Sequence, residues 1–265
     1  MTHEEKVARW IGPGKIGVEI GAFKSPVPGL DPKPIYVDRF RDYAGERCLA
    51  DYYGDATELP FRDNSLDYVI TSHVLEHVAN PVKALAEWYR VLRPGGVIYC
   101  LVPDRRFTWD HARALTSVDH MLDDYTRGTT VSDGTHINDF VDGVDWSTYS
   151  PATPAADVPA KKKELKEIYH GAVNAGNEIN IHFHVFEPSN LLALFETLRM
   201  GPRHRFAWAV VDQAERFPAN NPIGFLAVVQ VEKTWSDCVA GWLNRRRSQR
   251  DPRAIVLPSA KPFDP

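Results

Sequence analysis

The sequence predicts an α/β protein built on a doubly wound sheet, and two observations lead to this fold class. Short apolar segments recur at 18–21, 34–38, 66–71 and 97–102, each followed by charged or glycine-containing residues. Such runs are typical of parallel strands that are covered on both faces. Between the last two, residues 81–92 place apolar side chains along one helical face, and Pro94-Gly95-Gly96 ends the helix. This alternation of strand, helix and strand predicts helices on the faces of a parallel sheet.

The elements at the two ends of the chain complete this prediction. Residues 4–11 form a short amphipathic helix, and Gly12 to Gly17 matches the letters Gly-x-Gly-x-x-Gly. A phosphate-binding loop follows a strand and begins a helix, whereas this one follows a helix and leads into an apolar run. We therefore expect only a turn there. Towards the other end, a helix over 189–200 and strands over 206–211 and 225–231 are expected.

The composition limits the classes of function. With 265 residues, of which 43% are hydrophobic, the chain can bury one large core. The net charge of −4 argues against a protein that binds nucleic acid through its phosphates. The longest apolar runs fall short of the roughly 18 residues of a membrane span, so no membrane insertion is expected. No basic region followed by an apolar stretch opens the sequence, which predicts a cytoplasmic location.

Three cysteines, Cys48, Cys100 and Cys238, are widely spaced and form no Cys-x-x-Cys pair. This pattern fits a reduced compartment and argues against a disulfide framework or a structural zinc cluster.

A polar, acidic segment rich in aromatic residues interrupts the pattern after residue 102. We interpret 105–180 as a cap inserted into a domain that spans 1–233, with 234–265 as a C-terminal tail. Within the cap, residues 150–163 contain three prolines and little apolar surface, which predicts a mobile loop.

Three acidic residues stand at the ends of successive predicted strands, where open α/β sheets bind ligands. Glu19 precedes Gly21 at the end of the first strand, Asp38 ends the second, and Asp55 precedes the fourth. A carboxylate after the second strand can accept hydrogen bonds from both hydroxyls of a ribose, and an aspartate beside a backbone amide can contact an adenine edge. Together the three predict an adenosine pocket.

Several motifs in register resemble class I S-adenosylmethionine-dependent methyltransferases of the subgroup called type 11. They are Val18-Glu-Ile-Gly-Ala22, Asp38, 54–69, Ser72-His-Val-Leu-Glu-His-Val78, 88–96 and His184-Val-Phe-Glu-Pro-Ser-Asn-Leu191. The resemblance implies a Rossmann-like sheet of seven strands that closes with an antiparallel strand pair, and S-adenosylmethionine as cofactor.

The resemblance also implies a role for each matching position. Glu19 and Gly21, with Ala22 and Phe23 after them, would shape the turn at the methionine end. Asp38 would hold the ribose, Asp55 and Ala56 would meet the adenine, and Ser72 and His73 would line the sulfonium side. The sequence departs from the family at Phe23 and Ser25, where glycines are usual, which leaves the path of this loop open.

Methyl transfer from a sulfonium is an in-line displacement, so catalysis can come largely from holding the acceptor in place. A hydroxyl acceptor also needs a general base or a bound cation. His111 and His184 are the leading candidates for the base, since histidine is the commonest side chain in that role. If 180–184 is extended, His182 and His184 share a face. Asp104 and His182 are the candidates for binding Mg²⁺.

The acceptor is expected to be a saccharide hydroxyl. Aromatic faces among short polar side chains suit a carbohydrate, and the cap supplies Phe107, Trp109, Tyr125, Trp146 and Tyr149. The alternative is that these rings form a small core within the cap. The cap also resembles those of bacterial polysaccharide methyltransferases, including the mycobacterial enzymes of methylmannose polysaccharide assembly.

Other functions stay open at this point. They are methylation of another small molecule or natural product, a nicotinamide-dependent oxidoreductase, and a non-catalytic module that binds S-adenosylmethionine. The oxidoreductase is disfavoured because no Gly-x-Gly-x-x-Gly follows the first strand.

Overall fold

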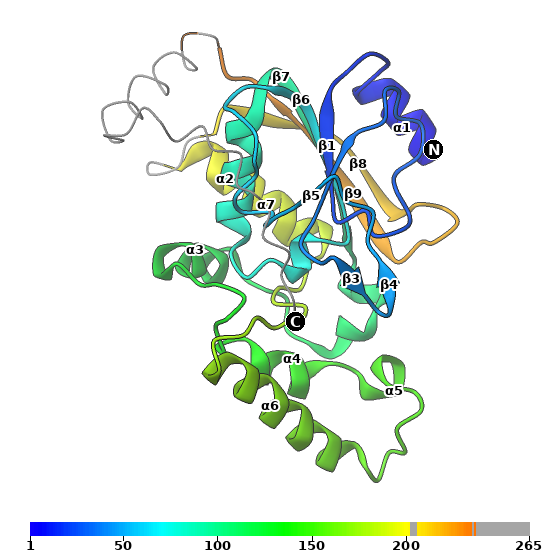
Figure 1. Cartoon of the computed structure of the whole chain (residues 1–265), viewed down its shortest axis with the longest axis vertical. Helices are drawn as coiled ribbons and strands as arrows, with labels where there is room; N and C mark the ends of the chain where they lie inside the picture. Colours follow the sequence, from blue (N-terminus) through cyan, green and yellow to red (C-terminus); the bar gives the residue numbers. More distant parts are fainter. Residues whose placement is uncertain (202–205, 235, 237–265) are drawn as a thin grey trace.

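The computed structural model describes residues 1–201, 206–234 and 236, and seven of its strands form one mixed sheet (Figure 1). The strand order is β5-β2-β1-β6-β7-β9-β8. The strands are β1 (Gly17–Ile20), β2 (Ile35–Asp38), β5 (Tyr52–Tyr53), β6 (Leu66–Ser72), β7 (Leu92–Pro103), β8 (Trp208–Phe217) and β9 (Gly224–Val231). The pairs from β5 to β7 are parallel, and β9 is antiparallel to both β7 and β8. The predicted Rossmann-like sheet with its C-terminal antiparallel pair is confirmed.

Helices cover both faces of this sheet. The helices α2 (Pro81–Val91) and α7 (Pro188–Met200) pack on one face, in a core that includes Val69 and Ile98. The helix α1 (His3–Trp10) packs on the other face, against Tyr68 and Tyr99. Neighbouring residues of one strand thus enter opposite cores, as the strand period of two requires. None of the helices in the described ranges combines the length and the apolar character that a bilayer crossing needs.

The order of the strands determines where a ligand can bind. The strand β1 lies between β2 and β6, so the chain leaves β1 towards one side and later returns to its other side. At such a switch point the loops after neighbouring strands diverge and leave a crevice at the carboxyl ends. A small hairpin, β3 (Asp42–Tyr43) and β4 (Glu46–Arg47), follows β2 at this end.

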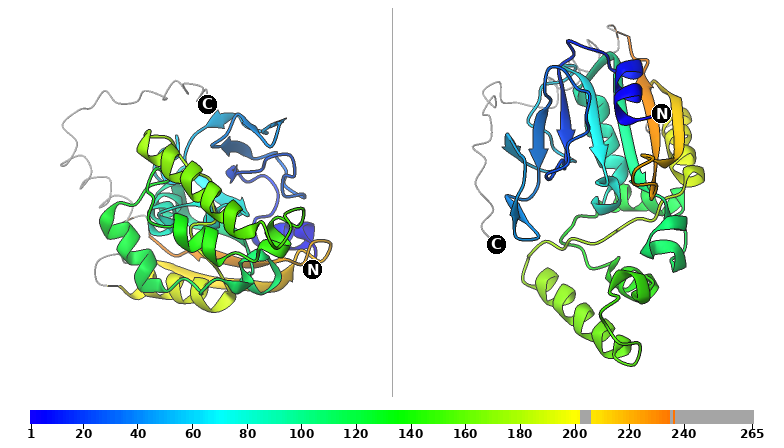
Figure 2. Two further views of the ribbon diagram at one scale, coloured as in Figure 1. Left: turned by 90° about the horizontal axis from the view of Figure 1, so that it is seen from below. Right: turned by 90° about the vertical axis from the view of Figure 1, so that its right-hand side faces the viewer.

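The segment between β7 and β8 lies largely beyond the same end of the sheet (Figures 1 and 2). It contains two 3₁₀ turns, η2 (Arg105–Phe107) and η3 (Trp109–Ala112), and the helices α3 (Val118–Arg127), α4 (Ile137–Gly143), α5 (Trp146–Tyr149) and α6 (Val158–Asn174). Residues of α4, α5 and 179–183 form a buried apolar cluster of their own.

The structure differs from the expected loop in the cap, and it describes little of the expected C-terminal tail. The loop predicted over 150–163 is wrong for its second half, because α6 begins at Val158. None of the residues of this helix is fully buried, but one apolar face packs against the cap's apolar cluster through Val158, Leu165, Tyr169, Ala172 and Val173. Pro159 occupies its first turn, and Lys161 and Glu164 form an ion pair. The C-terminal tail predicted over 234–265 lies outside the described residues, apart from Thr234 and Ser236.

The turn predicted at 12–17 is confirmed. Gly12 and Gly14 both adopt positive φ angles, and β1 begins directly after this turn, at Gly17. The Gly-x-Gly-x-x-Gly letters therefore lie before the first strand and far from its carboxyl end.

Candidate functional site

A cavity of about 1050 Å³ opens at the carboxyl ends of β1, β2 and β6. Its sheet side is lined by Gly21, Phe23, Asp38, Asp55, Ala56 and His73. These are six of the nine residues expected to contact the cofactor. The other three, Glu19, Ala22 and Ser72, lie beside them in the chain and do not line the cavity. Natural ligand sites span roughly 300 to 1,000 Å³, so the cavity has room for a nucleoside cofactor together with a small acceptor.

Asp38 is the last residue of β2, and only 5% of it is exposed. Its Oδ1 accepts a hydrogen bond from the backbone N–H of Phe40, at 2.9 Å. Burial raises the pKa of Asp38 above the usual aspartate value, while backbone N–H groups of Phe40, Phe23 and Arg39 counteract the shift. This carboxylate is fixed in position at the cavity wall and can accept hydrogen bonds from a diol.

Glu19 lies behind the loop that follows β1, almost fully buried. Its Oε1 accepts a hydrogen bond from the backbone N–H of Val27, at 2.8 Å, and its Oε2 is buried without a hydrogen-bond partner. Burial raises the pKa of Glu19 to about 7. The hydrogen bond from Val27 ties the loop that follows β1 to Glu19; the turn-shaping role of Glu19 stays a prediction.

The loop after β1 has a phenylalanine, Phe23, where a glycine is usual, and its backbone conformation shows how this is possible. Gly21 has a φ of +68°, and a Cβ there would lie 2.5 Å from Cγ2 of Val74. Phe23 has a φ of +48°, in the left-handed region that glycine occupies easily. The loop thus keeps a glycine-like conformation at Phe23, at a cost of about 1–2 kcal/mol, and the ring packs edge-on against Tyr43.

Asp55 and Arg39 form the rim of the cavity beside Asp38. Asp55 accepts a hydrogen bond from the N–H of Thr57 at 2.7 Å, and its other oxygen lies 3.3 Å from the Arg39 guanidinium. Arg39 in turn contacts Glu178 at 2.7 Å. These ion pairs connect the end of β2 to the segment that precedes α7.

The opposite wall of the cavity was not predicted from the sequence. It carries short polar side chains from the N-cap of α2, from the end of α3 and the segment after it, and from the segment before α7: Asn80, Thr126, Thr129, Thr130, Ser132 and Asn180. Lone Ser, Thr and Asn residues in polar stretches give no periodic or motif signal, so only the folded structure brings them together.

Two histidines of the Ser72–Val78 motif line the cavity, His73 and His77. The buried Glu76 lies between them, with its Oε1 3.8 Å from a ring nitrogen of each, and its Oε2 has no hydrogen-bond partner. Burial lowers the pKa of His73 to about 4 and of His77 to about 3, and it raises the pKa of Glu76 to about 7. Both imidazoles are therefore neutral at pH 7 and keep one unprotonated nitrogen.

Neither histidine expected to be the base lines the cavity. His111 lies on η3 with its side chain half exposed, 3.7 Å from Asp145. His184 is fully buried, and its Nε2 lies 3.3 Å from the carbonyl of Ala79, behind the cavity wall.

The residues expected to bind Mg²⁺ have other partners. Both carboxylate oxygens of Asp104 accept hydrogen bonds from the Arg106 guanidinium, which leaves Asp104 poorly suited to a cation. His182 contacts Asp110 through its Nδ1 at 2.6 Å, and Asp110 also pairs with Arg113. His182 and His184 also belong to two separate groups of side chains, so they do not serve one site.

The aromatic residues expected to contact a sugar mostly pack on one another. Trp109, Trp146 and Tyr149 belong to the apolar cluster around Phe140. Of the five aromatic residues expected to contact a sugar, Tyr125 lines the cavity. The alternative of a small core within the cap therefore describes most of these rings.

Residues 11–100 match the model of a family described as a methyltransferase domain. The matched range contains β1, β2 and β6, which supply the sheet side of the cavity. Over these residues the chain is therefore similar to a methyltransferase domain, and they lie on the Rossmann-like fold described above.

Partial similarity to known proteins and solved structures was also found. Over 49 residues the chain is 53% identical to a demethylmenaquinone methyltransferase from Staphylococcus aureus strain JH9, a match that covers 18% of this chain and 20% of that relative. The chain thus spans about a fifth of the length of this curated relative. Among solved structures, a SAM-dependent methyltransferase from Methanosarcina mazei aligns with a TM-score of 0.46 at 15% identity, over 87% of this chain and 99% of that one. One from Thermotoga maritima aligns with a TM-score of 0.42 at 18% identity, over 88% and 90%.

Proposed function

We propose that the chain transfers the methyl group of S-adenosylmethionine to a hydroxyl of an acceptor bound in the same cavity. One observation carries this proposal: the buried Asp38 carboxylate lies at the wall of a cavity formed by the matched methyltransferase domain. When bound, S-adenosylmethionine supplies an electrophilic methyl on a sulfonium. The protein supplies the position of the two reactants and the exclusion of water.

The sheet side of the cavity suits the nucleoside. Asp38 can accept hydrogen bonds from the ribose hydroxyls, and Ala56, beside Asp55, offers an apolar surface to the adenine. Because Gly21 has no Cβ, the backbone of the turn can lie close to Val74 at the cavity wall. With the nucleoside bound in this way, the sulfonium end would point towards His73, which follows β6.

The opposite wall suits a polyhydroxylated acceptor such as a saccharide. Hydroxyl and amide side chains can both donate and accept hydrogen bonds, and Thr126, Thr130, Ser132 and Asn180 offer them towards one cavity. A quinone-like ring would make few hydrogen bonds to this wall, whereas the hydroxyls of a saccharide can replace the water that these groups bind. This contrast supports a saccharide hydroxyl over a mainly apolar acceptor.

His73 is the candidate base within the cavity. Burial lowers its pKa to about 4, so the imidazole is neutral at pH 7 and a ring nitrogen can accept a hydrogen bond from the acceptor hydroxyl. The low pKa makes it a weak base, and the Glu76 carboxyl, 3.8 Å away, is placed to stabilise the imidazolium when the proton is transferred. The backbone of His73 has a φ of +55°, a strained conformation for a histidine. Such strain is often found at functional sites, where the surrounding structure maintains it.

Binding and turnover test the proposal separately. Calorimetry with S-adenosylmethionine, S-adenosylhomocysteine and NAD should show binding of the first two and none of the third. Formation of S-adenosylhomocysteine is then measured over a panel of oligosaccharides and quinols. Preferential binding of NAD would overturn the proposed cofactor, and turnover of quinols alone would overturn the saccharide acceptor.

His73→Gln should lower turnover by roughly 10²- to 10⁴-fold while S-adenosylmethionine still binds, because glutamine retains a polar group but takes no proton. The same change at His111 separates the two assignments. A comparable loss in His111→Gln, with full activity in His73→Gln, would restore His111 as the base.

A further inference from the structure

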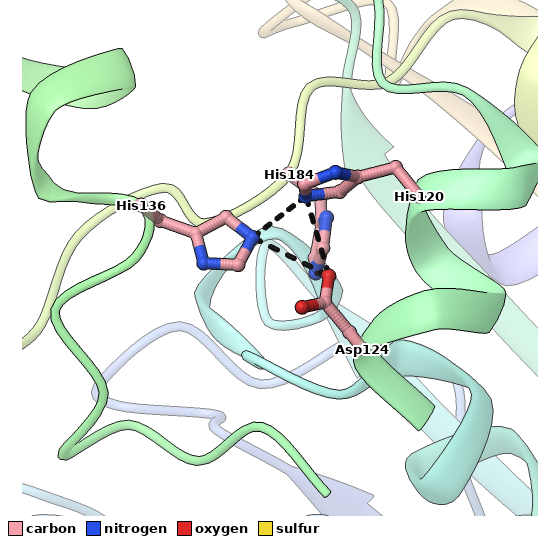
Figure 3. A group of neighbouring side chains, drawn as sticks. All are labelled: His120, Asp124, His136 and His184. Carbon is pink, nitrogen blue, oxygen red and sulfur yellow. Dashed lines mark hydrogen bonds and ion pairs between the residues drawn. The ribbon is translucent and has the colours of Figure 1, made fainter. Parts of the chain in front are cut away.

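A second group of side chains lies just behind the cavity wall and takes no part in the proposed reaction. It consists of His120 and Asp124 on α3, His136 directly before α4, and His184 in the segment before α7 (Figure 3). Each points one atom towards a common centre, and these four atoms lie within 4.8 Å of one another. Asp124, His136 and His184 are buried, whereas the His120 side chain is about half exposed.

The separations match those of ligands around one metal ion. Nε2 of His120 lies 2.9 Å from Nε2 of His136 and 3.3 Å from Oδ2 of Asp124. Oδ2 of Asp124 lies 3.4 Å from Nε2 of His136 and 3.8 Å from Nε2 of His184. Zinc binds nitrogen at about 2.0–2.1 Å and carboxylate oxygen at about 2.0–2.2 Å, so neighbouring ligand atoms of a tetrahedral site are roughly 3.3 Å apart.

One further feature indicates a ligand at this centre. Oδ2 of Asp124, in a side chain that is 6% exposed, is buried without a hydrogen-bond partner, although it faces three imidazoles. A buried carboxylate oxygen in that state is unfavourable unless something binds it.

The groups behind the ligand atoms are oriented by a second set of contacts. Oδ1 of Asp124 accepts a hydrogen bond from Thr129 at 2.8 Å, and Nδ1 of His136 lies 2.9 Å from the Thr135 hydroxyl. Metal ligands in proteins are commonly held by such contacts on the side away from the ion.

We propose that His120, Asp124, His136 and His184 form a binding site for a divalent transition-metal ion of the zinc type. Three imidazoles and one carboxylate suit Zn²⁺ better than Mg²⁺, which prefers oxygen ligands. Four protein ligands leave no open position on a tetrahedral ion, so the role is structural. The partly exposed His120 provides the route of entry.

The ion would fasten together three segments that form the acceptor side of the cavity. Asp124 precedes the lining residues 125–132, His184 follows the lining residues 179–180, and Asn80, another lining residue, donates a hydrogen bond to the carbonyl of Asp124. The four side chains take no part in the proposed reaction, so metal binding can be measured without turnover.

The full chain, purified without a histidine tag and stripped with a chelator, is titrated with Zn²⁺ against a fluorescent chelator. We expect one tightly bound ion per chain, and a rise in the thermal midpoint on binding. With Co²⁺ in place of Zn²⁺, visible absorption of tetrahedral intensity should appear. His120→Ala and Asp124→Asn should each weaken Zn²⁺ binding at least 100-fold and abolish the thermal shift; His120 is exposed enough that its variant should fold.

A neighbouring group, Glu76, His77 and His182, also brings three potential ligand atoms within 4.8 Å. His77→Ala is therefore the matched control, and it should leave the affinity for Zn²⁺ unchanged. Absence of Zn²⁺ binding by the folded wild type would overturn the proposal, as would loss of the ion in His77→Ala with retention in His120→Ala.

Discussion

Asp38→Asn is the sharpest test of the cofactor pocket. The substitution keeps the size of the side chain and an oxygen that can accept the hydrogen bond from the N–H of Phe40. It removes the negative charge and replaces one acceptor oxygen with a donor. The variant should therefore fold normally while its affinity for S-adenosylmethionine falls.

The magnitude follows from the burial of this carboxylate. A hydrogen bond to a charged acceptor contributes about 1.5–3 kcal/mol, and water cannot replace it at a residue that is 5% exposed. The loss of one such bond to the ribose weakens binding by roughly 10- to 150-fold. Calorimetry measures the change directly, with the thermal midpoint recorded in parallel.

Asp42→Asn is the matched control. Asp42 lies four residues further along the chain, is exposed, and pairs with Arg47 rather than lining the cavity. Its variant should bind S-adenosylmethionine with unchanged affinity. Equal affinity in Asp38→Asn and wild type, or equal losses in the two variants, would refute the ribose assignment.

The pH dependence of binding gives an independent check on Asp38. Burial raises the pKa of this carboxyl, so it becomes protonated at a higher pH than an ordinary aspartate. Protonation removes an acceptor, and affinity should therefore decline as the pH falls through this raised pKa. Asp38→Asn should abolish that part of the pH profile.

Two further predictions concern the loop after β1. Gly21→Ala combines a positive φ with a Cβ 2.5 Å from Val74, so it should lower the free energy of unfolding by about 2–4 kcal/mol. Gly45→Ala, the control, has a positive φ but nothing within 4 Å of the added Cβ, and it should cost only about 1–2 kcal/mol. Chemical denaturation measures both variants, and equal losses would contradict the clash. For Glu19, whose pKa burial raises to about 7, the folded protein keeps a proton that the unfolded chain releases near its ordinary value of about 4.3. Without ligand, stability should fall as the pH rises from about 4.5 to 7, and Glu19→Gln should reduce the drop measured between pH 5 and 8 by up to roughly 3 kcal/mol; a drop as large as that of the wild type would contradict the burial argument.

The sheet was predictable because its signal is local. Buried parallel strands appear as short apolar runs, and the amphipathic helix at 81–91 repeats its apolar residues at helical spacing. The acids at strand ends follow from the same reasoning, since parallel strands all present their carboxyl ends at one edge. Asp38 and Asp55 were placed at one cavity in this way.

The cap was less predictable because its contacts are distant in sequence. The helix α6 begins within a polar, proline-containing stretch, and the apolar residues of its packed face, such as Leu165 and Tyr169, are only partly buried among lysines and glutamates. His184 was expected at the reaction centre because it follows His182 at strand spacing, yet the fold directs it towards α3. His77 also lines the cavity, although no functional role was predicted for it from the sequence.

The two walls of the cavity come from different parts of the chain. The nucleoside side belongs to residues 20–58 and 73–79, and the facing side draws its hydroxyl groups from 126–132. Under the proposed function, changes in residues 126–132 would alter the choice of acceptor while leaving the side that binds the methyl donor intact. Grafting residues 105–180 onto another chain of this fold should transfer the choice of acceptor as a module.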